Sequence, residues 1–197
     1  LAMAAGPVTA EVSGVPTVEP AFGLPAAWID STKKERAETL GYTVVDPASV
    51  LSTHLTEVIK SHASEVLTRQ DTRDLLDNLK EASPALIDGL IPGQLSLSEV
   101  QEVLKNLLHE RVSIRDLISI LETISTLAAS NIKDTDLLSE ASRQTLARSI
   151  SNQNRSADGA LHVLTLSPRV ERVLAESMSE QGLRLNLNPQ IAQHLME

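Results

Sequence analysis

The spacing of hydrophobic positions changes near residue 46. Before it, residues 1–29 contain four of the nine prolines and three of the eight glycines. Because proline fixes φ and removes an amide donor, this stretch predicts short extended segments and turns rather than a long helix. A short strand is expected near 26–29, an exposed helix over 32–40 and a second strand over 42–45. After residue 46 the apolar residues recur every three or four positions, as in amphipathic helices.

Capping residues mark where helices begin in this second region. Asp46 and Pro47 form an N-cap followed by proline at the first helical position. The helix that they start is expected to bury one apolar face, made of Val50, Leu51, Leu55, Val58, Ile59, Ala63, Val66 and Leu67. Ser96 and Glu99 form a capping box, in which each side chain accepts a backbone N–H of the other residue. The helix after the box is expected to bury Val100, Val103, Leu104, Leu107 and Leu108.

Three further helices complete the predicted helical region. They are expected to start at residue 71 or 72, at Ser83-Pro84 and at Asp116. The five helices are joined by short connections, and their apolar residues are almost all aliphatic. We therefore expect residues 46–130 to form an autonomous helical bundle.

The C-terminal part mixes helical and strand patterns. One helix is expected from Leu137 to Ile150, and the apolar run Leu161–Leu166 is the strongest strand prediction in the chain. Because an isolated strand leaves its amides unpaired, its partner strands are expected in the N-terminal segment or outside these 197 residues.

The pattern continues to the end of the chain. Ser167 and Pro168 begin a helix that is expected to close at Gly182, and Asn188 with Pro189 begins a last one. That last amphipathic pattern has no closing residue, and the chain starts with Leu1. We therefore expect a fragment of a longer protein.

Composition excludes several classes of function. The formal net charge of −9 and the pI of about 5.0 argue against a nucleic-acid-binding surface, which needs clustered Lys and Arg. The chain has no cysteine, which excludes disulfides, thiolate zinc sites and cysteine nucleophiles. No apolar run approaches the ~20 residues that span a bilayer, and no secretory signal is visible at the start.

No motif for catalysis, cofactor binding or metal binding stands out. The chain has no glycine-rich phosphate loop, dinucleotide fingerprint, nucleophile elbow or zinc-protease motif. His54 and His62 share a helical face, but a third metal ligand is not indicated. Asp71, Asp74 and Asp77 alternate with basic residues and fit a solvated, salt-bridged face better than an acid–base pair. These observations predict an interaction protein rather than an enzyme, with no catalytic, cofactor-binding or metal-binding residue.

Several sequence blocks resemble one known family. They read TVEPAFGLPAAWI at 17–29, GYTVVDP at 41–47, RQ at 69–70 and VSIRD at 112–116. In this order they are similar to the FlhA/InvA (FHIPEP) family, the export-gate membrane proteins of type III secretion systems. The RQ block favours the flagellar branch over the injectisome branch.

The resemblance implies a fold and an organisation. It implies a mainly α chain with a few short strands (α+β), in which a helical bundle subdomain is flanked by partial α/β subdomains. Residues 1–45 would end the first cytoplasmic subdomain, residues 46–130 would form the helical subdomain, and residues 131–197 would belong to the last α/β subdomain. The membrane spans of the whole protein would precede this part of the chain.

The resemblance also implies a function and its partners. Family members form a nonameric ring on the cytoplasmic side of the bacterial inner membrane, where they dock export chaperones with their substrates and contact other export-apparatus proteins. Two further hypotheses stay open: a generic helical adaptor, and the non-catalytic part of an enzyme whose active half lies elsewhere.

Two groups of candidate site residues follow from the resemblance. The docking group is expected at Val18, Phe22, Gly23, Leu24, Ala26 and Trp28, in a segment without positive charge that sets aromatic anchors among prolines. The alternative is that Phe22 and Trp28 are core residues. The ring-contact group is expected at Arg69, Arg73, Arg111 and Arg115. The alternative for Arg115 is that it braces the start of a helix internally.

Overall fold

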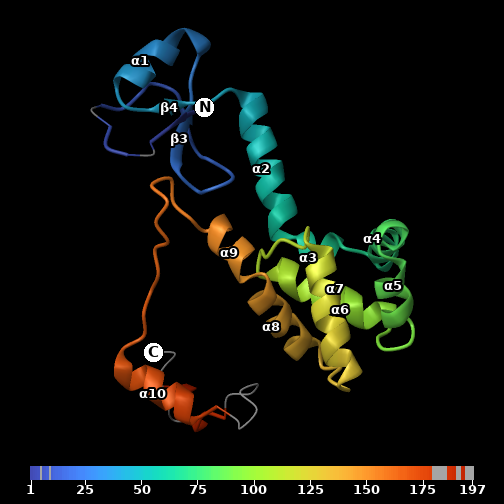
Figure 1. The fold of residues 1–197 in the computed structure, drawn as a ribbon. Helices are drawn as coiled ribbons and strands as arrows, with labels where there is room; N and C mark the ends of the chain where they lie inside the picture. The colour runs from blue at the N-terminus through green and yellow to red at the C-terminus, as the bar shows by residue number, and fades with distance from the viewer. Residues whose placement is uncertain (5, 9, 179–185, 190–191, 194–197) are drawn as a thin grey trace.

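The structure is a computed structural model that describes residues 1–4, 6–8, 10–178, 186–189 and 192–193. A small antiparallel sheet lies at one end, and a body of short helices lies at the other (Figure 1). The mainly α fold with a few short strands is confirmed.

The sheet has the strand order β2-β3-β1-β4. Its strands are β1 (Ala2–Met3), β2 (Val15–Val18), β3 (Pro25–Trp28) and β4 (Thr43–Val44). Hairpin pairing sets Val15 opposite Trp28 and Val18 opposite Pro25. The edge strand β2 contains Pro16, which suits an edge because proline has no N–H to donate to a neighbouring strand.

The helix predicted over 32–40 is confirmed as a 3₁₀ turn, η1 (Ser31–Lys33), followed by α1 (Lys34–Thr39). Asp30 caps the turn by accepting the Thr32 N–H at 2.9 Å. Gly41 follows the helix with φ of +95°, a conformation that glycine adopts readily because it has no Cβ.

A long helix leads from the sheet to the helical body (Figure 1). It is α2 (Pro47–Ser61), and its predicted cap is confirmed, since the Asp46 carboxylate accepts the Ser49 N–H at 3.0 Å. The short helix α3 (Ala63–Val66) follows.

The predicted burial of the apolar face of this helix is wrong for most of its length. Val50 and Leu67 are buried, but five large members of the face are exposed: Leu51, Leu55, Val58, Ile59 and Val66. The main contacts of α2 are with α3, so no described element covers its apolar face.

The helical body contains six helices among the described residues. They are α4 (Arg69–Ala82), α5 (Pro84–Leu90), α6 (Leu97–His109), α7 (Leu117–Ala129), α8 (Thr135–Thr145) and α9 (Ala147–Gln153). The capping box of Ser96 and Glu99 is confirmed. Helix α4 starts before the predicted residue because Thr68 and Asp71 form a second capping box. The single helix predicted from Leu137 to Ile150 is instead two helices, divided at Leu146.

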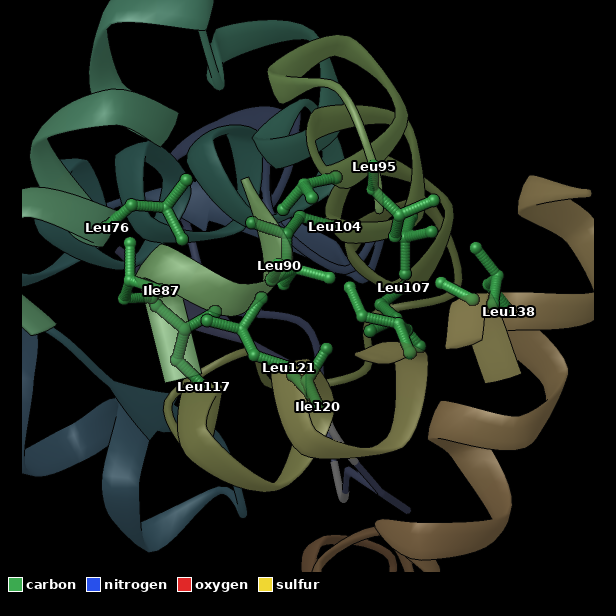
Figure 2. Close-up of a cluster of buried hydrophobic side chains, with 14 of the residues drawn as sticks. Leu76, Ile87, Leu90, Leu95, Leu104, Leu107, Leu117, Ile120, Leu121 and Leu138 are labelled. Carbon is green, nitrogen blue, oxygen red and sulfur yellow. The ribbon is translucent and has the colours of Figure 1, made fainter. Parts of the chain in front are cut away.

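The core of the body is aliphatic, as its composition predicts. Figure 2 shows Leu90, Leu104 and Leu107 turned toward Ile120 and Leu121, with Leu138 closing one side. Leu104, Leu107, Ile120, Leu121 and Leu138 have no exposed surface. The same cluster extends to Leu146, so the core continues into α8 beyond residue 130.

The strand predicted at Leu161–Leu166 is not present. These residues form an extended connection with no strand pairing, and Leu164 is fully exposed. A strand needs a neighbour to satisfy its amides, and no described strand lies beside this run. The helix α10 (Pro168–Glu176) follows with the predicted Ser167 cap, while the predicted stop at Gly182 lies outside the described residues. Ala192 donates to the Asn188 carbonyl at 3.0 Å, as expected where a last helix begins.

Candidate functional site

The loop of the β2–β3 hairpin is held by its own backbone. Glu19 N–H donates to the Leu24 carbonyl at 2.8 Å, and Gly23 N–H donates to the Glu19 carbonyl at 3.0 Å. Gly23 has φ of +70° and open space around its α-carbon, so the left-handed backbone, and not crowding, favours glycine there. The loop therefore has a defined shape, with Phe22 at its turn.

The predicted docking residues occupy this hairpin. Phe22 is 63% exposed, Val18 is 60% exposed and Trp28 is 39% exposed, while Leu24 and Ala26 are half-buried. Phe22 is thus not a core residue. The hairpin therefore exposes several large apolar side chains to solvent, on two short strands that are joined by a hydrogen-bonded turn.

Val15 and Glu19 are two residues of this hairpin that the sequence prediction missed. Val15 is 66% exposed and lies opposite Trp28, so the two side chains share one face of the sheet. Glu19 is buried, and its carboxylate accepts backbone N–H groups of the loop. Strand register places Val15 beside Trp28, and hydrogen bonds to the loop hold Glu19 in its buried position. Neither feature can be read from the spacing of residues in the sequence.

Side chains of both charges lie close to Trp28, although the hairpin segment itself contributes no positive charge. Residues 1–29 carry no Lys or Arg. Trp28 lines a hollow of about 270 Å³ together with Lys34 and Asp46. Hydrogen bonds from the Ser49 hydroxyl and amide hold the pKa of Asp46 below its usual range, so this carboxylate is ionised at neutral pH.

The four predicted ring-contact arginines do not form one site. Arg69 and Arg73 lie on α4, whereas Arg111 and Arg115 lie in the connection between α6 and α7. Arg69 donates to Ser98 Oγ at 2.8 Å. Among the described residues, the side chains of Arg73 and Arg115 form no hydrogen bond or ion pair.

Arg111 and Arg115 share a cleft of about 540 Å³. Lys60 and Glu57 of α2 line it with them, and Leu108 and Val112 supply apolar surface. The cleft thus gathers three cationic side chains against one carboxylate, in a chain whose net charge is −9. A hydrogen bond from Lys60 holds the pKa of Glu57 below its usual range.

Arg111 is fixed in place within the cleft. Its guanidinium donates to Ser61 Oγ at 3.0 Å and lies 3.8 Å from Glu57, while its carbonyl accepts from Gln153 Nε2 at 3.1 Å. Its φ of +59° is uncommon for a residue with a side chain. Arg115 is exposed beside it, with its side chain unpaired in the described structure.

Three of the candidates for metal or acid–base chemistry have structural partners. His62 Nδ1 lies 3.0 Å from Glu65, Asp71 caps α4, and Asp74 accepts from Gln70 at 2.7 Å. Within the described ranges, no three His, Cys, Asp or Glu residues are grouped as a metal site needs. None of the helices that the structure describes has the length and apolar character to cross a membrane.

Comparison with known sequences identifies a family. The sequence profile of the FHIPEP family matches residues 1–197. "Flagellar biosynthesis protein FlhA" of Bacillus subtilis is 46% identical over 198 residues, which cover 100% of this chain and 29% of that protein. The chain therefore spans less than a third of the length of this curated relative.

Solved structures share the fold. A chain in the complex of Chlamydia pneumoniae CdsV and CdsO is 28% identical, with a TM-score of 0.68 over 87% of this chain and 50% of that chain. The nonameric SctV-C of EPEC is 26% identical, with a TM-score of 0.67 over 99% of this chain and 60% of that chain.

Proposed function

Because the chain belongs to the FHIPEP family, we propose that it is part of the docking platform of a flagellar type III protein export gate, where it binds export chaperones with their substrates. The 46% identity to a relative named as a flagellar biosynthesis protein favours the flagellar system over an injectisome. In this proposal the chain is non-catalytic. It works on the cytoplasmic side of the bacterial inner membrane, anchored by spans outside the 197 residues.

The exposed hairpin carries the docking proposal. Phe22, Val18 and Trp28 offer apolar surface on a loop whose backbone is already fixed by hydrogen bonds. An ordered loop loses little entropy on binding, and aromatic anchors at such positions dominate many interfaces. Gly23, Leu24 and Ala26 shape the loop and the strand behind the anchor.

Substitution of Phe22 tests this proposal. The protein for the test is a chimera of the Bacillus subtilis relative in which residues 1–197 replace the matching segment. Phe22→Ala is expected to weaken binding of a purified flagellar chaperone–substrate complex about 30-fold, the effect of losing an anchor worth about 2 kcal/mol. The control is Leu55→Ala, which removes a similarly exposed apolar side chain that lies on α2 and not on the hairpin. Equal binding by both variants, measured by calorimetry, would contradict docking at the hairpin.

We also propose that the chain assembles into a ring through its helical body. The nonameric state of the EPEC relative supports this proposal, as does the cationic cleft, where the Arg115 side chain has no partner within the described ranges. Guanidinium groups suit contacts with carboxylates of a neighbouring copy because they donate two parallel hydrogen bonds. Arg69 and Arg73 on α4 would supply the contacts on a different surface of the body.

Charge reversal at the cleft tests the ring proposal. Arg115→Glu is expected to abolish nonamers of the chimera in membranes, as counted by electron microscopy. The control is Arg148→Glu, which makes the same change at an exposed arginine of α9 outside the four candidates. Normal rings in the Arg115 variant would remove this residue from the interface.

A further inference from the structure

The carboxylate of Glu19 is buried inside the loop that carries Phe22. Glu19 is 2% exposed, although Pro20 and Phe22 beside it are exposed. Its Oε1 accepts the Ala21 N–H at 3.0 Å and its Oε2 accepts the Phe22 N–H at 2.7 Å. No ion pair joins it to a Lys, Arg or His in the described part of the chain.

Burial of a carboxylate is costly unless hydrogen bonds replace its water. Here two backbone N–H groups do so, and bonds to an ionised acceptor are stronger than neutral ones. The backbone of Glu19 adds two more bonds, to Leu24 and Gly23. One residue therefore fixes the peptide groups on both sides of the exposed aromatic ring.

We propose that Glu19 is the positioning residue of the docking loop. Its carboxylate orients the backbone of Ala21 and Phe22, so that the Phe22 ring meets its partner in a preset direction. This inference rests on the proposed docking function of Phe22. The benefit to binding is entropic, because a loop ordered in advance does not have to be ordered by the partner.

Neutralisation of Glu19 tests the loop itself. Glu19→Gln keeps the length of the side chain but turns an NH₂ group toward one of the two N–H donors, so one charge-assisted bond is lost. Loss of such a bond corresponds to roughly a tenfold change in the opening equilibrium. We expect amide exchange at Ala21 and Phe22 of the 197-residue chain to become about tenfold faster by NMR. The matched control is Glu11→Gln, the same change at an exposed glutamate, which should leave both amides unchanged. Unchanged exchange in the Glu19 variant would overturn the proposal.

A double-mutant cycle separates positioning from general support of the hairpin. In the chimera, Glu19→Gln is expected to weaken chaperone–substrate binding about tenfold, and to have no further effect once Phe22→Ala is present. An equal loss in both backgrounds, or normal binding with Phe22 intact, would overturn the positioning role. If the Phe22→Ala variant binds the chaperone–substrate complex normally, the proposed docking function is wrong. The amide-exchange measurement then still tests whether Glu19 orders the loop.

Discussion

Helices α2 and α6 have similar patterns of apolar residues and different surroundings. Both begin at a side chain that caps the first turn, and both repeat apolar residues every three or four positions. In α6 these residues are buried: Val100, Val103, Leu104 and Leu107. In α2 the buried residue is Val50 alone among those described.

The difference lies in what packs against each helix. Helix α6 contacts α3, α4 and α8, whereas α2 runs between the sheet and the body and contacts mainly α3 (Figure 1). A periodic stripe shows which face of a helix is apolar, but another element has to cover that face before it becomes core. Two leucines at similar positions in their helices are therefore expected to differ widely in their contribution to stability.

The largest expected effect comes from truncating one leucine in each helix. Leu104→Ala is expected to lower the free energy of unfolding by roughly 2–5 kcal/mol, because it leaves a cavity in the closed core. Leu55→Ala is expected to change it by less than about 0.5 kcal/mol, because the side chain is 55% exposed. Urea unfolding of both variants measures the difference, and similar losses would show that the two faces are equally covered.

A smaller effect is expected from removing the caps. Ser96→Ala is expected to cost about 1 kcal/mol, because Ser96 Oγ accepts the Glu99 N–H at the start of a core helix. Asp46→Ala removes the corresponding bond from α2, whose main described contacts are with α3 and not with the helices of the body. Its cost in global stability is therefore expected to stay below about 0.5 kcal/mol. A larger loss for Asp46→Ala would mean that α2 unfolds together with the body.

The smallest effect is expected from acid. Hydrogen bonds from the Ser96 amide and hydroxyl hold the pKa of Glu99 below its ordinary value of 4.5. A carboxylate with a lowered folded-state pKa stabilises the fold above its unfolded pKa, and that contribution is lost as the pH falls through the folded value. Stability of the body should therefore decline below about pH 4.5, and Glu99→Gln should remove part of this decline.

The same acid titration distinguishes the two helices. The pKa of Asp46 is also lowered, mainly by the Ser49 hydroxyl, so its cap on α2 is lost only below its ordinary value of 3.8. NMR of the Ser49 and Ser96 amides, which donate to the carboxylates of Asp46 and Glu99, follows the two caps separately. Loss of the Asp46 cap above pH 3.8 would contradict this expectation.

Local signals explain how much of the fold the sequence predicts. Asp46, Ser96 and Ser167 act within one turn of the chain, and all three caps are present. The strand at Leu161–Leu166 depends on a partner strand, and it does not form where none is described. Local chemistry thus predicts helix starts, whereas burial and pairing depend on distant parts of the chain.

The candidate site can also be predicted only where the signal is local. The composition of the hairpin segment suggests Phe22 and Trp28, and the structure leaves both partly or largely exposed. The buried Glu19 gives no signal in the sequence, because an isolated glutamate between valine and proline is usually assigned to the surface. The four arginines are easy to select by charge, but only the fold separates the α4 pair from the cleft pair.

The position of Trp28 determines what spectroscopy will report. It is the single tryptophan of the chain and lies in the sheet, while circular dichroism at 222 nm is dominated by the helices of the body. The two units are joined through α2, whose 15 residues extend about 22 Å at 1.5 Å per residue (Figure 1). We therefore expect tryptophan fluorescence and circular dichroism to report on different parts of the molecule. If the sheet and the body unfold separately, the two unfolding curves will not coincide.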